Sequence, residues 1–583
     1  MTRVLVLLVV SLSMAAVASA QGWMQWGANA RHESAVGASG QRLDRIQAEV
    51  VIDPFVIAEK TFAGGSLLTH YPVPLIDGDD LFVILKGGSF VDFQHRSTQT
   101  WSVQAMRRNG LGLTTRWTYA SDWKPLPTPG GALGPTWEPV YHPALTADSV
   151  WAPGAGGTID RVSRIDGSRI QRFNPFGTTV DTSIYMAGPP SIDDAGNIYY
   201  NAIQLDTSAP WTSDVRAAWL VKVQPNSPVA IKVPFSSIVS GAPASNAQCT
   251  TSFPTSQLPW PPSPGAVAPT VTCGAQRPGV NVAPAIAADG TIYTISRAHL
   301  NDRYGYLVAV NPNLTPKWTA TLRNRFNDGC NVMIPPNGSP GGCRTGTFTG
   351  VDPAENQPGS GRVSDNSTSS PVVAPDGRIV YGSYTRYNYS QGHLMSFNPD
   401  GTFVASYGWG WDLTPAVWRH DGTYSLLLKE NHYDAPAYCS GSSNCPGDRT
   451  FTTPGDPEQY FITQLNPSLQ VEWKFRNTET KSCVRVDGQV QCFDDHPHGF
   501  EWCVNALAVD GRGVVYANAE DGNVYAIDQG GTLRERIFLT LALGAAYTPL
   551  SIGGDGRIYT QNDGRLFVVG AEVGPRRRAA RPQ

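Results

Sequence analysis

Short apolar runs and tight turns alternate along most of this chain. Eight times, a few apolar residues lead into a turn of the Asp-Gly type, and a stretch rich in Ile, Val and Tyr follows. An Asp-Gly turn between apolar runs favours a β-hairpin, because Gly adopts positive φ without strain. The turns lie at Asp77-Gly78, Ala147-Asp148, Asp194-Ala195-Gly196, Asp289-Gly290, Asp376-Gly377, Asp421-Gly422, Asp510-Gly511 and Asp555-Gly556.

The spacing of these turns predicts the architecture. The intervals from residue 376 to 421 and from 510 to 555 are 45 residues long, roughly the length of one four-stranded propeller blade. Eight repeats therefore predict an all-β fold, an eight-bladed β-propeller of four-stranded antiparallel blades. The last repeat has no outer strand, whereas residues 48–52 form a strand without a hairpin partner. We expect these two to pair and close the ring, which removes an exposed sheet edge.

The ends of the chain are expected to lie outside the propeller, which we assign to residues 45–571. Residues 1–20 combine an early arginine, an apolar run and a final Ala18-Ser19-Ala20, the pattern of a cleaved signal peptide. Residues 21–44 are an N-terminal extension, and residues 572–583 are a basic tail that we expect to be disordered. No later apolar run approaches the roughly 18 residues of a membrane span. We therefore expect a secreted or periplasmic protein.

All nine cysteines fall in the three longest intervals between turns. These intervals are rich in Pro, Gly and Ser, which indicates irregular surface loops inserted into the blades. A crosslink lowers the entropy that a long insertion loses on folding, so local disulfides are expected in an exported protein. The expected pairs are Cys249–Cys273, Cys330–Cys343, Cys439–Cys445 and Cys483–Cys492. Cys503 is left over, although the sequence leaves open which of Cys483, Cys492 and Cys503 is unpaired.

Composition and motifs argue against several classes of function. Charged residues make up 16% of the chain and the formal net charge is −4, which gives no reason to expect nucleic acid as a partner. The sequence contains no Gly-x-Ser-x-Gly, no His-Glu-x-x-His and no phosphate-binding glycine loop, so no catalytic residues are assigned. We expect a monomer that binds a protein or a glycan.

Several segments carry a family resemblance. The opening Trp23–Asn29 and the blade pieces at residues 305–311 and 522–528 resemble the repeats of the PQQ-like (quinoprotein-type) β-propeller family. The likeness covers most of residues 21–571. In that family each blade closes with a strand carrying a tryptophan that packs between blades. The resemblance implies this docking role for Trp117, Trp318 and Trp473.

The resemblance also bears on cofactors. The alcohol dehydrogenases of that family hold PQQ and calcium beneath a disulfide between adjacent cysteines and use an acidic base. This chain has no adjacent cysteines and no Cys-x-x-Cys-His haem motif. The resemblance therefore implies the non-catalytic branch, which is similar to outer-membrane assembly scaffold propellers. No cofactor is expected, and PQQ with calcium is not expected.

One stretch is dense in polar side chains and is a candidate metal site. It comprises Asp494, Asp495, His496, His498 and Glu501. Carboxylates and imidazoles together can hold a divalent ion or move protons, and His432-Tyr433-Asp434 in the same interval could converge on them. The alternative is a solvated polar loop. We favour the loop, because metal sites usually draw ligands from several elements.

These features favour a binding or scaffolding protein that acts through the face from which its loops project. One alternative is an extracytoplasmic enzyme, either a divergent PQQ-dependent dehydrogenase or a metal-dependent enzyme using residues 494–501. Another is carbohydrate binding, because exposed aromatic side chains can stack on sugars. The candidate aromatics are Trp409, Trp411, Tyr384, Tyr387 and Tyr389.

Overall fold

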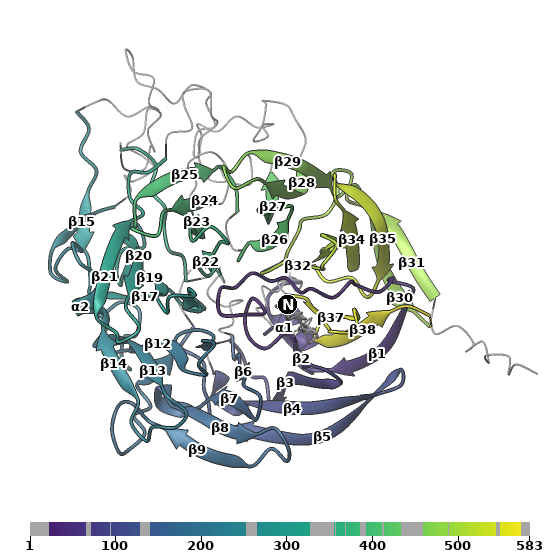
Figure 1. Ribbon diagram of the computed structural model, residues 1–583, viewed down its shortest axis with the longest axis horizontal. Helices are drawn as coiled ribbons and strands as arrows, with labels where there is room; N and C mark the ends of the chain where they lie inside the picture. Colours follow the sequence, from purple (N-terminus) through teal and green to yellow (C-terminus); the bar gives the residue numbers. More distant parts are fainter. Residues whose placement is uncertain are drawn as a thin grey trace, which may run out of the picture.

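The chain folds into a closed ring of eight β-sheet blades in a computed structural model (Figure 1). This confirms the predicted all-β, eight-bladed propeller. Among the residues that the structure describes, no helix is long and apolar enough to cross a membrane. The described residues are 22–65, 72–93, 95–128, 140–251, 265–326, 355, 357–365, 367, 369–384, 392–410, 413–432, 459–487, 489–543 and 549–572.

Each blade runs from an inner strand at the ring centre to an outer strand at the perimeter. Blade 1 contains β2 (Leu75–Asp77), β3 (Asp80–Gly88), β4 (Gln99–Asn109) and β5 (Gly112–Ser121), and blade 2 contains β6 (Ala144–Leu145), β7 (Ser149–Pro153), β8 (Ile159–Ser163) and β9 (Arg169–Phe173). In blade 3, β10 (Ile184–Met186) and β11 (Ser191–Ile192) share the inner position, followed by β12 (Ile198–Gln204), β13 (Ala217–Val223) and β14 (Ile231–Pro234). Blade 4 likewise begins with β17 (Gln276–Pro278) and β18 (Ala285–Ile286), followed by β19 (Ile292–Ala298), β20 (Gly305–Val310) and β21 (Pro316–Thr321).

The second half of the ring repeats this order. Blade 5 contains β22 (Val372–Val373), β23 (Ile379–Tyr384), β24 (Gly392–Phe397) and β25 (Phe403–Tyr407), and blade 6 contains β26 (Ala416–His420), β27 (Thr423–His432), β28 (Gln459–Leu465) and β29 (Val471–Arg476). Blade 7 contains β32 (Ala508–Val509), β33 (Val515–Asn518), β34 (Asn523–Asp528) and β35 (Thr532–Phe538), and blade 8 contains β36 (Ser551–Ile552), β37 (Ile558–Asn562), β38 (Arg565–Gly570) and β1 (Arg45–Val51).

The sequence pattern explains these blades. Each of the eight turns joins the inner strand of a blade to its second strand, and Gly290 and Gly377 in two of them adopt φ of 80° and 84°. The middle strands are largely buried because neighbouring blades cover both faces, and every residue of β19 is buried. The outer strands are instead mostly exposed, and β5 has an exposed or half-exposed residue at nine of its ten positions.

The N-terminal strand closes the ring as predicted. β1 pairs antiparallel with β38, with Arg45 opposite Gly570 and Val51 opposite Arg565. β1 thereby supplies the outer strand that the last repeat lacks. The pairing joins the two ends of the propeller through main-chain hydrogen bonds and leaves blade 8 with the same four strands as its neighbours.

Residues 22–41, which we call the strap, run along the ends of the inner strands at the ring centre (dark purple in Figure 1). The sequence analysis assigns them to an extension, but they lie within the ring and contact all eight blades. Their hydrogen-bonded partners, in blade order, are Trp23 with Ile76, Met24 with Leu145, Gln25 with Ile192, Ala30 with Ile286, Arg31 with Val373, Glu33 with Val417, Ser34 with Val509 and Gln41 with Gly556.

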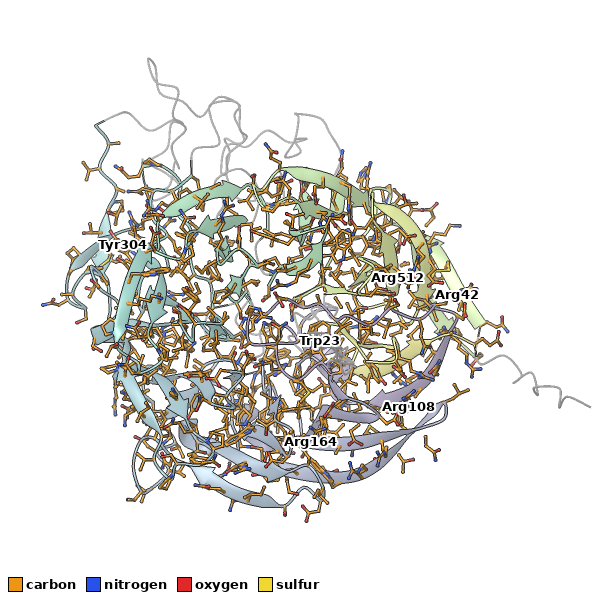
Figure 2. The ribbon with its side chains drawn as sticks, in the orientation of Figure 1. Trp23, Arg42, Arg108, Arg164, Tyr304 and Arg512 are labelled. Atoms are coloured by element: carbon orange, nitrogen blue, oxygen red, sulfur yellow. A yellow bond between two sulfur atoms is a disulfide. The ribbon has the colours of Figure 1, made fainter. Side chains whose placement is uncertain are left out.

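Tryptophans of the strap fill the centre of the ring. Trp23 lies there with no exposed surface (Figure 2). Trp26 is also buried, donates its indole hydrogen to Oγ1 of Thr414, which precedes blade 6, at 3.3 Å and packs edge-on against His142. Large aromatic side chains therefore occupy the space around the ring axis at this level.

His32 of the strap crosses the ring centre between blades. Its Nδ1 lies 2.8 Å from the carbonyl oxygen of Pro371, beside blade 5, and its Nε2 lies 3.2 Å from Oγ of Ser191 in blade 3. Burial lowers the pKa of His32 to about 4, so the ring is neutral at pH 7. A neutral imidazole that donates from Nδ1 and accepts at Nε2 satisfies both contacts.

The three tryptophans predicted to dock blades lie on the outer strands β5, β21 and β29. Each indole packs against a glycine in a turn of the next blade, and a Cβ added at Gly401 would lie 2.7 Å from the Trp318 ring. Each indole N–H also reaches that turn. Trp117 donates to the carbonyl of Arg164 at 3.0 Å, Trp318 to the carbonyl of Pro399 at 2.8 Å, and Trp473 lies 3.4 Å from Oε1 of Gln529.

Antiparallel order sorts the connections onto two faces. The turns from first to second strand and from third to fourth strand lie beside the strap, on what we call the strap face. The other connections, where their residues are described, leave from the opposite side, which we call the loop face. The loop face carries the helices α1 (Val56–Phe62) and α2 (Phe235–Ile238), the 3-10 turns η1 (Arg96–Thr98) and η3 (Ala155–Gly157), and two hairpins, β15 (Gln248–Thr250) with β16 (Thr270–Thr272) and β30 (Lys481–Val486) with β31 (Gln489–Asp494).

The two hairpins differ from the sequence prediction of wholly irregular insertions. Cys249 and Cys273 form a disulfide that joins the β15 and β16 segments, and Cys483 and Cys492 form another between opposed residues of β30 and β31. Each crosslink holds two short strands together where a long apolar pattern is missing. The positions Cys330, Cys343, Cys439 and Cys445 lie outside the described residues, as do the signal-like residues 1–20 and nearly all of the basic tail.

Candidate functional site

The predicted metal stretch begins at the end of β31, on the loop face. Asp494 ends that strand, and Asp495 accepts hydrogen bonds from the amide and hydroxyl of Ser482 at 3.2 and 2.6 Å and from Nδ1 of His496 at 2.7 Å. The Ser482 hydroxyl, followed by His496, lowers the pKa of Asp495 to about 2. His496 stacks on Phe500 with ring centroids 3.8 Å apart. These two candidates are thus held by local contacts of the hairpin.

Glu501, the last of the predicted ligands, joins a different group. Among the described residues, the one set of three potential ligands with all ligand atoms within 4.8 Å of one another is Glu501, Cys503 and Glu520. It brings together a segment before blade 7 and the loop after β33. The sequence analysis missed Cys503 and Glu520, because nothing in the local pattern links the two segments.

The contacts and the burial of this group indicate the protonation state of Cys503. Sγ of Cys503 lies 3.1 Å from Oε1 of Glu520, and Asn431 at the end of β27 donates to Glu501 at 3.1 Å. Burial raises the pKa of the Cys503 thiol well above its ordinary value, and the charges of Glu501 and Glu520 add to this. Only the thiolate binds metal well. The group is therefore a hydrogen-bonded network around a protonated, unpaired cysteine.

A second buried carboxylate lies at the same end of β27. Glu430 accepts hydrogen bonds from Nε2 of His432 and Nζ of Lys474, both at 2.6 Å, and from the hydroxyls of Thr463 and Tyr407, both at 2.8 Å. Burial alone would raise its pKa, but the bonds from His432 and Lys474 hold the pKa at about 2. Four donors occupy the acceptor sites of this carboxylate. It ties blade 5 to blade 6 and has no capacity left for a metal ion.

The sequence could have indicated this cluster. Lys429, Glu430, Asn431 and His432 follow the buried run at residues 426–428, and all four are themselves buried. A run of polar residues that continues a core strand needs partners from neighbouring strands. His432, which from the sequence could converge on residues 494–501, belongs to this cluster instead.

A third polar network lies on the loop face of blade 4. Arg277 donates two hydrogen bonds to Asp365 at 2.9 and 2.6 Å, Arg297 donates one at 3.0 Å, and Nε of Arg277 donates to Nδ1 of His299 at 2.8 Å. Burial would raise the pKa of Asp365, but the two arginines hold it far below its usual range. Burial, followed by the charges of Arg277 and Arg297, lowers the pKa of His299 to about 3. The network fixes the segment that leads into blade 5.

The aromatic candidates for sugar binding are engaged within the protein where they are described. Trp409 stacks on His432 with ring centroids 3.8 Å apart, and the Arg362 guanidinium lies over the ring of Tyr384 at 4.9 Å. Trp411, Tyr387, Tyr389, Tyr433 and Asp434 lie outside the described residues. The described aromatics are therefore used for packing between neighbouring strands and blades.

A shallow cleft of about 370 Å³ opens on the loop face beside η1. Lys124 lines it, but its ammonium donates to the carbonyls of Ser97 and Gln99 at 2.9 and 2.5 Å. Tyr185 and Leu126 supply part of its wall. The lining mixes prolines and Leu126 with polar and cationic side chains and contains no carboxylate among its described residues, so the cleft offers shape for a small ligand but no carboxylate base.

The features that the family resemblance implies for PQQ and calcium do not fit these residues. The described cysteines form the Cys249–Cys273 and Cys483–Cys492 disulfides, with 24 and 9 residues of separation, and no disulfide joins adjacent residues. The buried Glu430 and the half-buried Asp365 on the loop face are paired with cationic side chains. The described residues therefore do not form a quinone site of the kind that the resemblance implies.

Comparisons with known proteins support the fold. No protein-family model and no curated protein matches the chain. Among solved structures, it is similar to a europium-containing methanol dehydrogenase, with 10% identity and a TM-score of 0.50 over 93% of this chain and 89% of that one. It is also similar to the quinohemoprotein alcohol dehydrogenase from Comamonas testosteroni, with 11% identity and a TM-score of 0.50 over 96% of this chain and 82% of that one.

Both likenesses span nearly the whole chain, and at this identity they concern the fold alone. They support the PQQ-like propeller architecture that the blade segments suggest. They provide no support for assigning the chain to a non-catalytic branch. This chain therefore has the propeller fold of two dehydrogenases, built from a largely different set of residues.

Proposed function

We propose that this protein is a binding or scaffolding propeller that holds a partner at its loop face. The observation that carries the proposal is the contrast between its two faces. The strap covers the ring centre on one face and bonds to every blade, whereas the insertions that the structure describes leave from the other face. A ring that is closed and filled on one side is a rigid platform for the loops on the other.

The insertions support this function because two of them have a fixed structure. Disulfides hold the hairpins β15–β16 and β30–β31, so these parts of the loop face are arranged before any partner arrives. A surface that is already ordered loses less entropy on binding. The scaffolding members of the PQQ-like family are the expected functional relatives.

Export from the cytoplasm is part of the proposal. The disulfides are compatible with an oxidising compartment, and residues 1–20 have the pattern of a cleaved signal peptide. We infer that the mature protein acts in the periplasm or outside the cell. Mass spectrometry of the protein from the culture medium and the periplasm would detect a mature N-terminus at Gln21, and an intact residue 1 in the exported protein would overturn this inference.

A photo-cross-linking experiment tests the loop face. A photoreactive amino acid replaces Val267, which is 86% exposed in the insertion before blade 4, or Ile165, which is 80% exposed in a turn on the strap face. We expect specific cross-linked products in the native cell envelope or medium from position 267 and not from position 165. Products from position 165 alone, or from neither position, would contradict the proposal.

The dehydrogenase alternative has a separate test. The purified protein is incubated with PQQ and calcium, and reduction of a dye is followed with alcohols and sugars as substrates. The proposal expects no dye reduction above that of heat-denatured protein. Substrate-dependent reduction would replace the binding function with an enzymatic one.

A further inference from the structure

The β30–β31 hairpin leaves one strand edge open at the perimeter of the ring. Figure 1 shows β31 outside β35, the outer strand of blade 7. Arg485 of β30 turns toward that blade, where its guanidinium contacts the carbonyls of Phe538 and Leu539 and lies 5.4 Å from the Phe538 ring. β30 is thus the inner strand of the hairpin, and all six residues of β31 are exposed.

The register tells which backbone groups of β31 point outward. Cys483 and Cys492 are directly opposite, with Cα atoms 4.1 Å apart, the short spacing of a pair without mutual backbone hydrogen bonds. The pairs two residues away, Arg485 with Val490 and Lys481 with Asp494, are of the same kind. The N–H and C=O groups of Val490, Cys492 and Asp494 therefore face away from β30. Within the described residues they form no backbone hydrogen bond.

This edge lacks the protection that proteins give to open strands. Edge strands usually carry charges or proline that discourage pairing, and the outer blade strand β35 carries two arginines and a glutamate among its seven residues. In β31, residues 489–493 contain neither a charge nor a proline. Phe493 and Val486 lie on the side of the hairpin opposite Arg485 and are 58% and 41% exposed.

We propose that β31 is a docking edge to which an extended segment of a partner polypeptide adds as a third strand. The proposal rests on the proposed binding function and names its partner class as polypeptide. The outward N–H and C=O groups of β31 recur at the spacing of a β-strand. They can therefore form hydrogen bonds with the main chain of another extended segment. An apolar side chain of the segment would lie beside Phe493, and a basic one beside Asp494, the single charge of β31.

A second copy of β31 fits this edge less well. In one antiparallel arrangement of two copies of β31, Cys492 lies opposite the same residue of the second copy. Asp494 would then lie opposite Val490 of the partner subunit. That register adds no cation to the one that its own hairpin already places opposite the carboxylate, Lys481, and sets Asp494 beside an apolar residue. Charge complementarity therefore favours a different polypeptide that carries Lys or Arg.

The test uses the full-length, oxidised protein and a displayed library of random octapeptides as the probe. The variant Val490→Pro removes an outward N–H without removing a bond to β30, and Val490→Ala is the matched control that keeps this N–H. We expect enriched peptides with apolar residues at alternate positions and one Lys or Arg. Their affinity should fall at least about tenfold for Val490→Pro and stay within about threefold for Val490→Ala.

A second readout does not depend on the proline variant. Residue-resolved amide hydrogen exchange should show that a bound peptide slows exchange at Val490, Cys492 and Asp494 and leaves Gln491 and Phe493 unchanged. Peptide mapping should show the Cys483–Cys492 disulfide intact in both variants. Absence of enriched peptides, equal binding to all three proteins, or protection elsewhere would overturn the proposal.

Two further outcomes separate the competing explanations. If sedimentation shows a dimer that Val490→Pro dissociates, the occupant is a second copy and the proposal is wrong. If position 267 still cross-links a partner while the Val490→Pro variant keeps every product, the loop face binds but β31 does not. In that case the proposed function stands and the docking edge is rejected.

Discussion

Trp26 donates its indole hydrogen to Oγ1 of Thr414 at 3.3 Å, although the two residues lie 388 positions apart in the chain. The bond joins the strap to the segment that enters blade 6. Thr414 Oγ1 also accepts the backbone N–H of Ser370, which leads into blade 5, at 3.1 Å. One hydroxyl thus links the strap and two blades at the ring centre.

The first prediction concerns this contact. Replacing Trp26 with Ala should lower the free energy of unfolding by about 3–5 kcal/mol, because it opens a cavity at the ring centre and removes a buried hydrogen bond. Urea denaturation followed by circular dichroism would measure the change. The control is Ile57→Ala, whose side chain is 82% exposed and should shift stability by less than about 0.5 kcal/mol. Equal effects of the two substitutions would contradict a structural role for the strap.

Acid should destabilise the protein through His32. The unfolded chain binds a proton near pH 6.5, whereas the buried ring binds one only near its pKa of about 4. Between these values the unfolded state carries more protons, so stability falls as the pH falls, by roughly 3 kcal/mol for the full interval. His32→Gln should flatten the stability–pH curve between pH 6.5 and 4. The exposed His95→Gln serves as a control, and an unchanged slope in His32→Gln would contradict the assignment.

Docking of blades by tryptophan predicts that alanine substitutions at two glycines of similar conformation differ in their effect on stability. Gly401 has φ of 88° and lies against the Trp318 ring, whereas Gly422 has φ of 75° with nothing within 4 Å of an added Cβ. Gly422→Ala should cost only the strain of positive φ, about 1 kcal/mol. Gly401→Ala should cost about 1–3 kcal/mol more, because the methyl group displaces the indole. Thermal unfolding of both variants measures the difference, and equal melting temperatures would argue against docking by Trp318.

The thiol chemistry of the chain gives a further prediction. Burial raises the pKa of Cys503, so the folded protein should resist alkylation by iodoacetamide at pH 8, and urea should make this residue reactive. Peptide mapping without reductant should recover Cys249–Cys273 and Cys483–Cys492 as linked pairs. Rapid labelling of Cys503 in the native protein would contradict its buried, protonated state.

A measurement of bound metal distinguishes the two interpretations of residues 494–501, a metal site and a solvated polar loop. Equilibrium dialysis with zinc and calcium should give the same bound metal for the natural protein and for the double variant His496→Ala, His498→Ala. The reason is that His496 is occupied by Asp495 and Phe500, and Glu501 belongs to the network of Cys503. Metal that is bound by the natural protein and lost in the double variant would restore the metal site.

Local and near-local features could be predicted from the sequence. The Asp-Gly turns are set by two residues each, and the missing strand of the last repeat pointed to β1, because a ring leaves a single place for an unpaired strand. The pairing of Cys483 with Cys492 follows a short hairpin. These features depend on residues that are close in sequence or on a requirement of ring closure.

The strap and the buried networks could not be predicted in this way. The strap has no periodic pattern, because successive residues bond to different blades, and positive φ at Ala28, His32 and Ser34 breaks any regular element. Its one local signal was the density of Trp, Gly and His near the start of the chain. Glu501 and Cys503 precede blade 7, and Glu520 follows its second strand, so the three meet only when this part of the blade has folded.

The strap also sets the order in which the protein can mature. A ribosome makes residues 22–41 before any of the blades, yet Gln41 donates to the carbonyl of Asp555, 514 positions later. Contacts of such separation form slowly and only after the whole chain is available. A translation product that stops before blade 8 would carry both the strap and β1 without their final partners. The strap, made before the blades, therefore gains its full set of contacts only when blade 8 has been completed.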